Sequence, residues 1–171
     1  MEVRAARLDD VDALAEIHVA GFALAHRGLM PDEEIDARTV ELRRRMWQAR
    51  LQAPPPRDIV LVGVLDGALA GFVSAGEVDS HANGDADTSF WQNAYLHPDV
   101  VGTSAGRAVI EALHAELLVA MRAHGFRTAT SQIFTGNERS RRMFLRLGWE
   151  RDDSTSAEPT PFTSFRRSLE G

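Results

Sequence analysis

Small residues between an expected strand end and an expected helix start could form an anion-binding turn near the middle of the chain. From position 102 the residues read Gly102, Thr103, Ser104, Ala105, Gly106 and Arg107. Backbone N–H groups at a helix N-terminus attract anions, and small side chains let a phosphate approach them closely. A plain helix-start loop that needs glycine for its backbone angles explains the same residues. This segment alone therefore leaves a phosphate site and an ordinary turn as equal alternatives.

A second segment with helical spacing lies at 136–149. Asn137 belongs to the residue types that cap helix N-termini, and Gly148 is suited to end the helix. Phe144, Leu147 and Trp149 fit the buried side of that helix. Taken alone, the segment predicts only a basic amphipathic helix packed on a core.

Composition narrows the chemistry. The chain has 171 residues and no cysteine, and all 19 basic residues are arginine. Thiolate metal sites, cysteine nucleophiles and lysine Schiff bases are therefore excluded. No histidine has the spacing of a metal site with a carboxylate partner, so we expect no metal. The net charge of −6 argues against a nucleic-acid partner, and no apolar stretch is long enough for a membrane span, so a cytoplasmic protein is expected.

Hydrophobic periodicity predicts the elements that position the two segments. Strands are expected over residues 2–6, 59–65, 68–75, 89–96, 128–134 and 162–168. Helices are expected from about 11 to 22, from Pro31 to the prolines at 54–56, from 104 to 123 and from 137 to 147. Asp66-Gly67 predicts a hairpin turn, and residues 79–87 and 152–160 predict polar loops. The order predicts a single α+β domain over residues 1–171.

The helix that begins at Pro31 has an expected orientation. Its buried stripe is expected at Ile35, Leu42, Met46, Trp47 and Leu51. The consecutive arginines from Arg43 to Arg45 are expected on the solvated face of the same helix.

In this order, the segments resemble the GNAT-type N-acetyltransferase superfamily, and the resemblance covers nearly the whole chain. It rests on Val3-Arg4-Ala5-Ala6 with Asp9-Asp10, Ala70-Gly71-Phe72-Val73, His97-Pro98-Asp99, and the run from Asn137 to Trp149. The residues at 25–32 are also similar to those of members that act on small molecules. The resemblance implies a mixed, mostly antiparallel sheet, flanked by helices and splayed apart at a coenzyme A cleft.

The resemblance also implies that acetyl-CoA binds as co-substrate in this cleft. Its pantetheine arm would pair with the backbone of Ala94, Tyr95 and Leu96, and its pyrophosphate would lie on the turn from Gly102 to Arg107. Two positions depart from the family's turn, because Val101 replaces an Arg or Gln and Ser104 replaces a glycine. These departures favour weaker affinity without abolishing a site made of backbone N–H groups.

Three residues of the second segment would border the pantetheine arm and the thioester. Asn137 and Ser140 match the family's residues beside the pantetheine arm. Phe144 stands where many members carry a tyrosine that protonates the departing thiolate, and a phenylalanine cannot donate that proton. The usual general acid is therefore missing, and we predict that Phe144→Tyr preserves or raises any transferase rate.

The base that takes the proton from the amine is also displaced from its usual place. The family's glutamate would fall near Phe90 or Trp91, so Glu77 is the nearest replacement, with His81 as a weaker one. Both are also explained as ordinary surface residues. If Glu77 is the base, Glu77→Gln would lower turnover roughly ten- to a thousandfold. The tetrahedral oxyanion would be stabilised by a backbone N–H at a strand bulge near Leu96.

Two function classes follow. The first is an acetyl-CoA-dependent N-acetyltransferase that acts by direct transfer on a small-molecule primary amine, with a homodimer expected from family habit. The second is a catalytically degenerate domain that binds coenzyme A for regulation or protein interaction. The acidic balance, with Asp79, Asp85 and Asp87 near the expected substrate entrance, would suit a cationic amine.

Overall fold

The computed structural model describes residues 1–77, 86–154 and 161–170. Its helices are α1 (Val11–His26), α2 (Asp32–Asp36), α3 (Val40–Gln52), α4 (Ser104–Ala123) and α5 (Glu138–Arg146). Its strands are β1 (Glu2–Ala5), β2 (Ile59–Leu65), β3 (Ala68–Glu77), β4 (Thr88–Leu96), β5 (Thr128–Phe134), β6 (Glu150–Arg151) and β7 (Phe162–Ser168). Asp66 and Gly67 both have positive φ, as the predicted tight turn between β2 and β3 requires.

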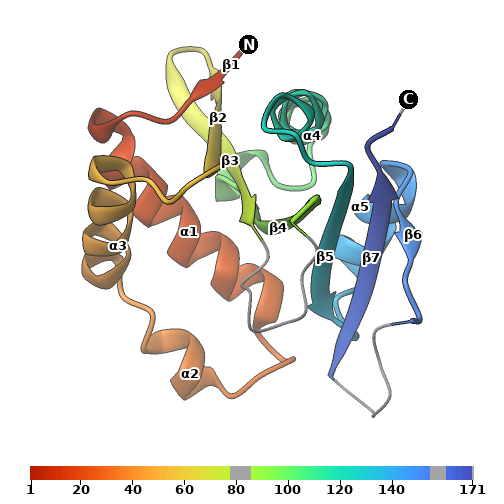
Figure 1. Ribbon diagram of the computed structural model, residues 1–171. Coiled ribbons are helices and arrows are strands. Elements are labelled where there is room, and N and C mark those ends of the chain that lie inside the picture. The colour runs from red at the N-terminus through yellow and green to blue at the C-terminus, as the bar shows by residue number, and fades with distance from the viewer. Residues whose placement is uncertain (78–85, 155–160, 171) are drawn as a thin grey trace.

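The strands form one mixed sheet that splits near its centre (Figure 1). The order is β1-β2-β3-β4-β5-β7-β6, and only β4 and β5 are parallel neighbours. These two strands pair at Thr88–Phe90 and Thr128–Thr130 and then diverge. The predicted α+β fold with a sheet splayed between these strands is therefore confirmed.

Helices cover both faces of the sheet and bury two separate clusters. α1 and α3 pack on one face, where Leu14, Trp47 and Phe72 are fully buried. α4 packs on the other face (Figure 1). Its Val109, Leu113, Leu117 and Met121 form a second cluster, which Phe144 of α5 joins. The 3.6-residue spacing of the α4 stripe is what holds that helix across the strands. No helix among the described residues has the length and apolarity to cross a membrane.

The segment after Pro31 differs from the prediction, because it forms two helices. Thr39 begins α3 as an N-cap whose Oγ1 accepts a hydrogen bond from the Leu42 amide (3.3 Å), and α2 ends three residues earlier. Because α3 begins anew after Thr39, its buried face is rotated relative to the face that one continuous helix would bury. Leu42 is therefore exposed, whereas Arg43 is half-buried and lines a cavity. Both residues were predicted on the opposite faces.

An extra residue in β4 decides which side chains face which helices. Ser74 pairs with Asn93 and Ala75 with Trp91, so Gln92 is inserted as a β-bulge. Without it, Trp91 and Asn93 would lie on the same face of the sheet. With it, Trp91 joins the cluster under α4 while Asn93 donates to Ser74 on the other face (2.8 Å).

Candidate active site

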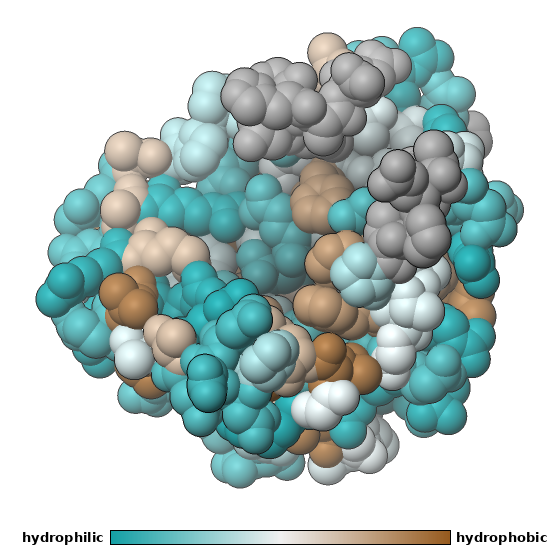
Figure 2. Space-filling view, turned by 90° about the horizontal axis from the view of Figure 1, so that it is seen from below, coloured by the Kyte–Doolittle hydropathy of each residue, from teal (hydrophilic) through white to brown (hydrophobic). Residues whose placement is uncertain are grey.

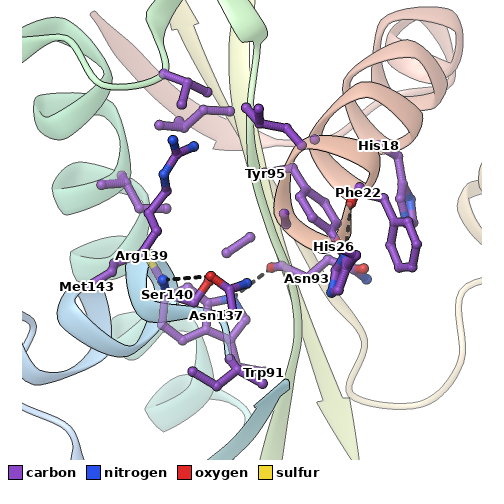
Figure 3. Close-up of a pocket in the computed structure, with 18 of the residues that line it drawn as sticks. His18, Phe22, His26, Trp91, Asn93, Tyr95, Asn137, Arg139, Ser140 and Met143 are labelled. Atoms are coloured by element: carbon purple, nitrogen blue, oxygen red, sulfur yellow. Dashed lines mark hydrogen bonds between the residues drawn. The ribbon is translucent and has the colours of Figure 1, made fainter. Parts of the chain in front are cut away.

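A cavity of about 580 Å³ occupies the gap between the diverging ends of β4 and β5. Its walls come from α1, α3, β4, β5, the start of α4 and α5. Seen from below, the surface is hollowed near its centre, with hydrophobic residues along one side of the hollow (Figure 2). In the close-up, α1 and α5 present side chains from opposite sides, with β4 between them (Figure 3). This volume is in the range of small-molecule and cofactor sites.

The backbone of β4 directs toward this cavity hydrogen-bonding groups that have no partner in the part of the chain that the structure describes. The His97 amide donates to the Ala70 carbonyl (2.8 Å), so the next facing pair, Gly71 and Leu96, is not hydrogen-bonded across the ladder. The N–H and C=O groups of Leu96 and Ala94 therefore point away from β3, toward the gap that opens where β5 diverges from β4. Tyr95 differs from the expectation, because the same alternation directs its backbone groups to Phe72 of β3.

The turn at the start of α4 supplies backbone donors, but fewer than predicted. The Gly106 amide is already bonded to the Thr103 Oγ1 (3.0 Å), and the Arg107 amide to the Thr103 carbonyl (3.1 Å). The first two helical amides, of Ser104 and Ala105, have no acceptor among the described residues. They point out of the helix N-terminus, where the helix dipole favours an anion.

Gly106 is needed in this turn for a different reason than the predicted close approach of a phosphate. A Cβ on Gly106 would lie 2.0 Å from the Val100 carbonyl oxygen, so the residue is glycine because helix and loop touch there. Gly102 has a φ of +81° and open space around its Cα. Gly102 is therefore the glycine beside which a ligand has room.

The start of α5 forms the wall opposite α1. Asn137 is buried, and its Oδ1 accepts a hydrogen bond from the Ser140 amide (3.1 Å), which confirms it as the N-cap (Figure 3). Asn137, Arg139, Ser140 and Met143 all line the cavity.

Phe144 lines the cavity, but most of its ring belongs to the core. It is 3% exposed, stacks on Phe165 with centroids 4.9 Å apart, and contacts Trp91 and Trp149. A hydroxyl added to this ring would enter an aromatic cluster, at a cost of about 1–3 kcal/mol if it stayed unpaired. The prediction that Phe144→Tyr preserves or raises the rate therefore meets a packing cost that the sequence does not reveal.

Two histidines of α1 border the cavity and both are neutral at neutral pH. Burial lowers the pKa of His18 to about 3, with smaller contributions from nearby arginines. Burial also lowers the pKa of His26, whose Nδ1 lies 2.8 Å from the Phe22 carbonyl. A carbonyl only accepts, so Nδ1 carries the hydrogen and the lone pair is on Nε2. His26 therefore presents a proton acceptor in the cavity wall (Figure 3).

Glu77 is not brought to this site. It ends β3 with an exposed side chain, 3.5 Å from the Arg57 guanidinium, and it is not among the residues that line the cavity. Arg57 also donates to the His124 carbonyl, at the far end of α4 from the anion-binding turn. The structure therefore does not place Glu77 in the lining of this cavity, and its role as the base stays a prediction. His81 lies outside the described residues.

The bulge predicted near Leu96 is also displaced, since the inserted residue of β4 is Gln92. Leu96 keeps its predicted place at the cavity, in regular strand geometry. Its available amide comes from the alternation of the ladder and not from a bulge.

The sequence does not predict several of the side chains that line the cavity, namely those of His18, Phe22, His26, Arg38, Arg43 and Tyr95. In sequence, Tyr95 reads as an ordinary strand residue, and the others read as positions on the buried stripe or the solvated face of ordinary helices. Only the break between α2 and α3, signalled weakly by Thr39 as a cap residue, could have directed attention to Arg38 and Arg43. The described residues contain no group of three or more His, Asp or Glu that could hold a metal ion.

Comparisons with known proteins agree with this geometry. A sequence model of the acetyltransferase (GNAT) family matches residues 16–149. No curated protein sequence matches the chain.

Solved structures share the fold over nearly the full length. PaiA N-acetyltransferase from Thermoplasma acidophilum, in complex with coenzyme A, is 16% identical with a TM-score of 0.73, covering 98% of both chains. Ribosomal-protein-alanine N-acetyltransferase from Brucella melitensis is 18% identical with a TM-score of 0.70, covering 98% of this chain and 99% of that one. The yncA protein from Salmonella typhimurium, with its cofactor acetyl-CoA, is 19% identical with a TM-score of 0.68, covering 99% of this chain and 94% of that one. With the family match and the splayed, donor-lined cleft, the chain belongs to the GNAT family of N-acetyltransferases, which transfer an acyl group from acyl-CoA to an amine.

Proposed function

We propose that the protein transfers the acetyl group of acetyl-CoA directly to the primary amine of a small molecule. The observation that carries the proposal is the shape of the cavity. It continues from the α4 turn, past β4, into a chamber that is lined by side chains of α1 and α3, among them His18, His26 and Arg43. A chamber lined by side chains on several sides suits a small ligand.

The residues divide the work between the two substrates. The amides of Ser104 and Ala105 would hold the pyrophosphate of acetyl-CoA, and the backbone of Ala94 and Leu96 would pair with the pantetheine arm. Asn137 and Ser140 would border that arm from α5. Acetyl-CoA supplies the activated thioester, while the chain positions the amine against it and provides N–H donors for the developing oxyanion.

Calorimetry with acetyl-CoA, followed by a coenzyme A release assay on a panel of amines, tests the proposal. The panel contains small primary amines and short peptides with free N-termini, because one structural neighbour is named for a ribosomal protein. We expect binding of acetyl-CoA and turnover with small amines. Binding without turnover on any member would favour the degenerate coenzyme A-binding domain, and turnover confined to peptides would overturn the small-molecule proposal.

His26 is the proton acceptor that the geometry offers. We expect His26→Gln to lower kcat roughly a hundredfold, because glutamine keeps a hydrogen-bonding group but cannot take a proton at this pH. The wild type should lose activity as pH falls below the ordinary histidine range, since burial lowers the pKa of His26 and the imidazole stays neutral until then. The variant should lack this acid limb in its pH–rate profile.

Glu77→Gln is the matched control for this prediction. Because Glu77 is exposed and outside the cavity lining, we expect its removal to change kcat less than about twofold. A large loss in Glu77→Gln together with wild-type kinetics in His26→Gln would reverse the assignment. Melting temperatures of both variants exclude unfolding as the cause.

A further inference from the structure

The acceptor side of the cavity is cationic, although the chain as a whole is acidic. The sequence carries 25 acidic and 19 basic residues. Among the described residues that line the cavity, however, none is Asp or Glu, while Arg38, Arg43 and Arg50 lie on its α1–α3 side. Asp87 is not part of the lining, and Asp79 and Asp85 lie outside the described residues. The local charge is therefore the reverse of what the net charge suggests.

Arg50 is already neutralised, so it leaves little charge for a ligand. Its Nε and one terminal nitrogen bond both carboxylate oxygens of Asp58 (2.9 and 2.5 Å). The same terminal nitrogen donates to the Gln92 Oε1 (2.8 Å). A two-point arginine–carboxylate pair of this kind is a complete ion pair.

Arg38 and Arg43 have no carboxylate partner among the described residues. The Arg38 guanidinium lies 4.4 Å from the Phe22 ring centroid and donates to the Glu34 carbonyl (3.0 Å). The Arg43 guanidinium donates to the Met46 sulfur (3.3 Å). The Nε atoms of both residues are buried without a hydrogen-bond partner. Burial lowers the pKa of Arg43, and the nearby charge of Arg38 lowers it further.

The neighbouring Arg44 differs from Arg43 in having carboxylate partners. Arg44, the next residue of α3, pairs with Asp12 and Glu41 at 2.5 and 2.7 Å on the outer side of the helix. Two half-buried cations that repel each other, line one cavity and have no carboxylate partner among the described residues are unfavourable without a bound anion. A ligand anion placed between them removes that cost.

The neighbouring polar groups are uncharged and complete the chamber. His18 is 4% exposed, lines the cavity, and has an Nδ1 without a hydrogen-bond partner. It stacks on Tyr95, with ring centroids 5.2 Å apart (Figure 3). Burial raises the pKa of Tyr95 to about 12, so its hydroxyl stays a donor at neutral pH. An anion in this chamber meets no negative group among the described lining residues.

Arg38 and Arg43 do not lie where the phosphates of acetyl-CoA would bind. The free amides for the pyrophosphate lie at the start of α4, which packs on the opposite face of the sheet from α1 and α3 (Figure 1). Arg107 lines the cavity on that other side. Arg38 and Arg43 are thus placed for the second substrate.

We propose that Arg38 and Arg43 bind an anionic group of the acceptor, so that the acceptor is a small amine that also carries a carboxylate or a phosphonate, as in an amino acid. This inference rests on the proposed function and names the substrate class of the same site. Arginine binds both kinds of oxyanion through paired N–H donors, and the distance between the anion and the amine would select the chain length of the substrate.

Matched acceptor pairs test this class directly. Each pair contains an amino acid and its uncharged amide, or an aminoalkylphosphonate and the alkylamine of equal length. We expect kcat/KM at least about tenfold higher for the anionic member, because a charged hydrogen-bonded pair discriminates by that order. Equal rates, or a preference for the amide, the alkylamine or a polyamine, would overturn the inference. Comparison of the carboxylate arm with the phosphonate arm identifies which anion the chamber prefers.

Charge-removing variants locate the effect. In Arg43→Gln and Arg38→Gln we expect KM for the anionic acceptor to rise about tenfold, with little change for its neutral partner. Arg44→Gln, which alters the adjacent residue outside the cavity lining, should leave the preference unchanged. Equal losses for both members of a pair, with a lower melting temperature, would mean that these arginines are structural and would contradict the proposal.

Binding separates this inference from the proposed function. If acetyl-CoA binds but no amine is acetylated, the proposed function fails, and calorimetric titration of the same amino acids and amides still decides the inference. Tighter binding of the anionic members, lost in Arg43→Gln, supports an anion-binding chamber. No difference between the members refutes it.

Discussion

Replacing Gly106 by valine should destabilise the protein by about 3 kcal/mol or more, which is an overpacking cost at its upper end. The Val100 carbonyl oxygen lies 2.0 Å and the Leu96 Cδ1 3.3 Å from the position of the new Cβ. The carbonyl belongs to the backbone and cannot rotate away, so the loop or the first turn of α4 must shift. For a chain of this size, the melting temperature should fall by about 6–12 °C. Affinity for coenzyme A should fall with it, because the displaced turn carries the Ser104 and Ala105 amides.

Gly102→Ala is the matched control, since Gly102 belongs to the same turn but has no atom within 4 Å of an added Cβ. Its only cost is the positive φ of +81°, which is about 1 kcal/mol for alanine. Differential scanning calorimetry compares the two variants. A melting temperature for Gly106→Val within about 2 °C of the wild type would show that the close contact in this turn is wrong.

Ser104→Pro should weaken coenzyme A binding about 10- to 100-fold with little change in stability. Ser104 is the first residue of α4, a position at which proline is well tolerated because the N–H has no partner within the helix. Thr103 has extended angles (φ −90°, ψ 166°), as a residue before proline prefers. The substitution therefore removes one amide donor and keeps the helix. A hydrogen bond to a charged group contributes about 1.5–3 kcal/mol, which sets the expected range.

Ser104→Ala keeps the amide and loses the hydroxyl, so it should bind coenzyme A within about threefold of the wild type. A truncated acetyl thioester of pantetheine, which has no pyrophosphate, should bind all three proteins alike. Calorimetric titration measures each affinity. Unchanged binding in Ser104→Pro, or an equal loss in Ser104→Ala, would place the pyrophosphate elsewhere.

Much of the fold could be predicted because its hydrophobic spacing is local. The stripe of α4, the Asp66-Gly67 turn and the N-cap at Asn137 each depend on residues within one or two helical turns or one hairpin. The break between α2 and α3 was missed because Ile35, Met46 and Trp47 fit one continuous stripe as well as two. β6 was missed because Glu150 and Arg151 are exposed and pair only with β7.

The coenzyme A side of the site was easier to predict than the acceptor side. Residues 102–107 act through backbone groups whose role follows from their place at a helix start. The acceptor side depends on which helix face meets the cavity, and the bulge at Gln92 and the cap at Thr39 both change that face. Arg43, taken alone in the sequence, cannot be told from its solvated neighbours Arg44 and Arg45.

The narrow junction between β4 and β5 has a consequence for the lifetime of the protein. Three residue pairs join the two halves of the sheet along this line. A bound pantetheine arm would form hydrogen bonds where β4 and β5 have diverged, and it would thereby link the two halves of the sheet. Saturation at a hundred times Kd adds about 2.7 kcal/mol to the free energy of unfolding. The cellular concentration of acetyl-CoA would thereby influence how often the sheet opens between β4 and β5. It would therefore also influence how fast proteases degrade the protein.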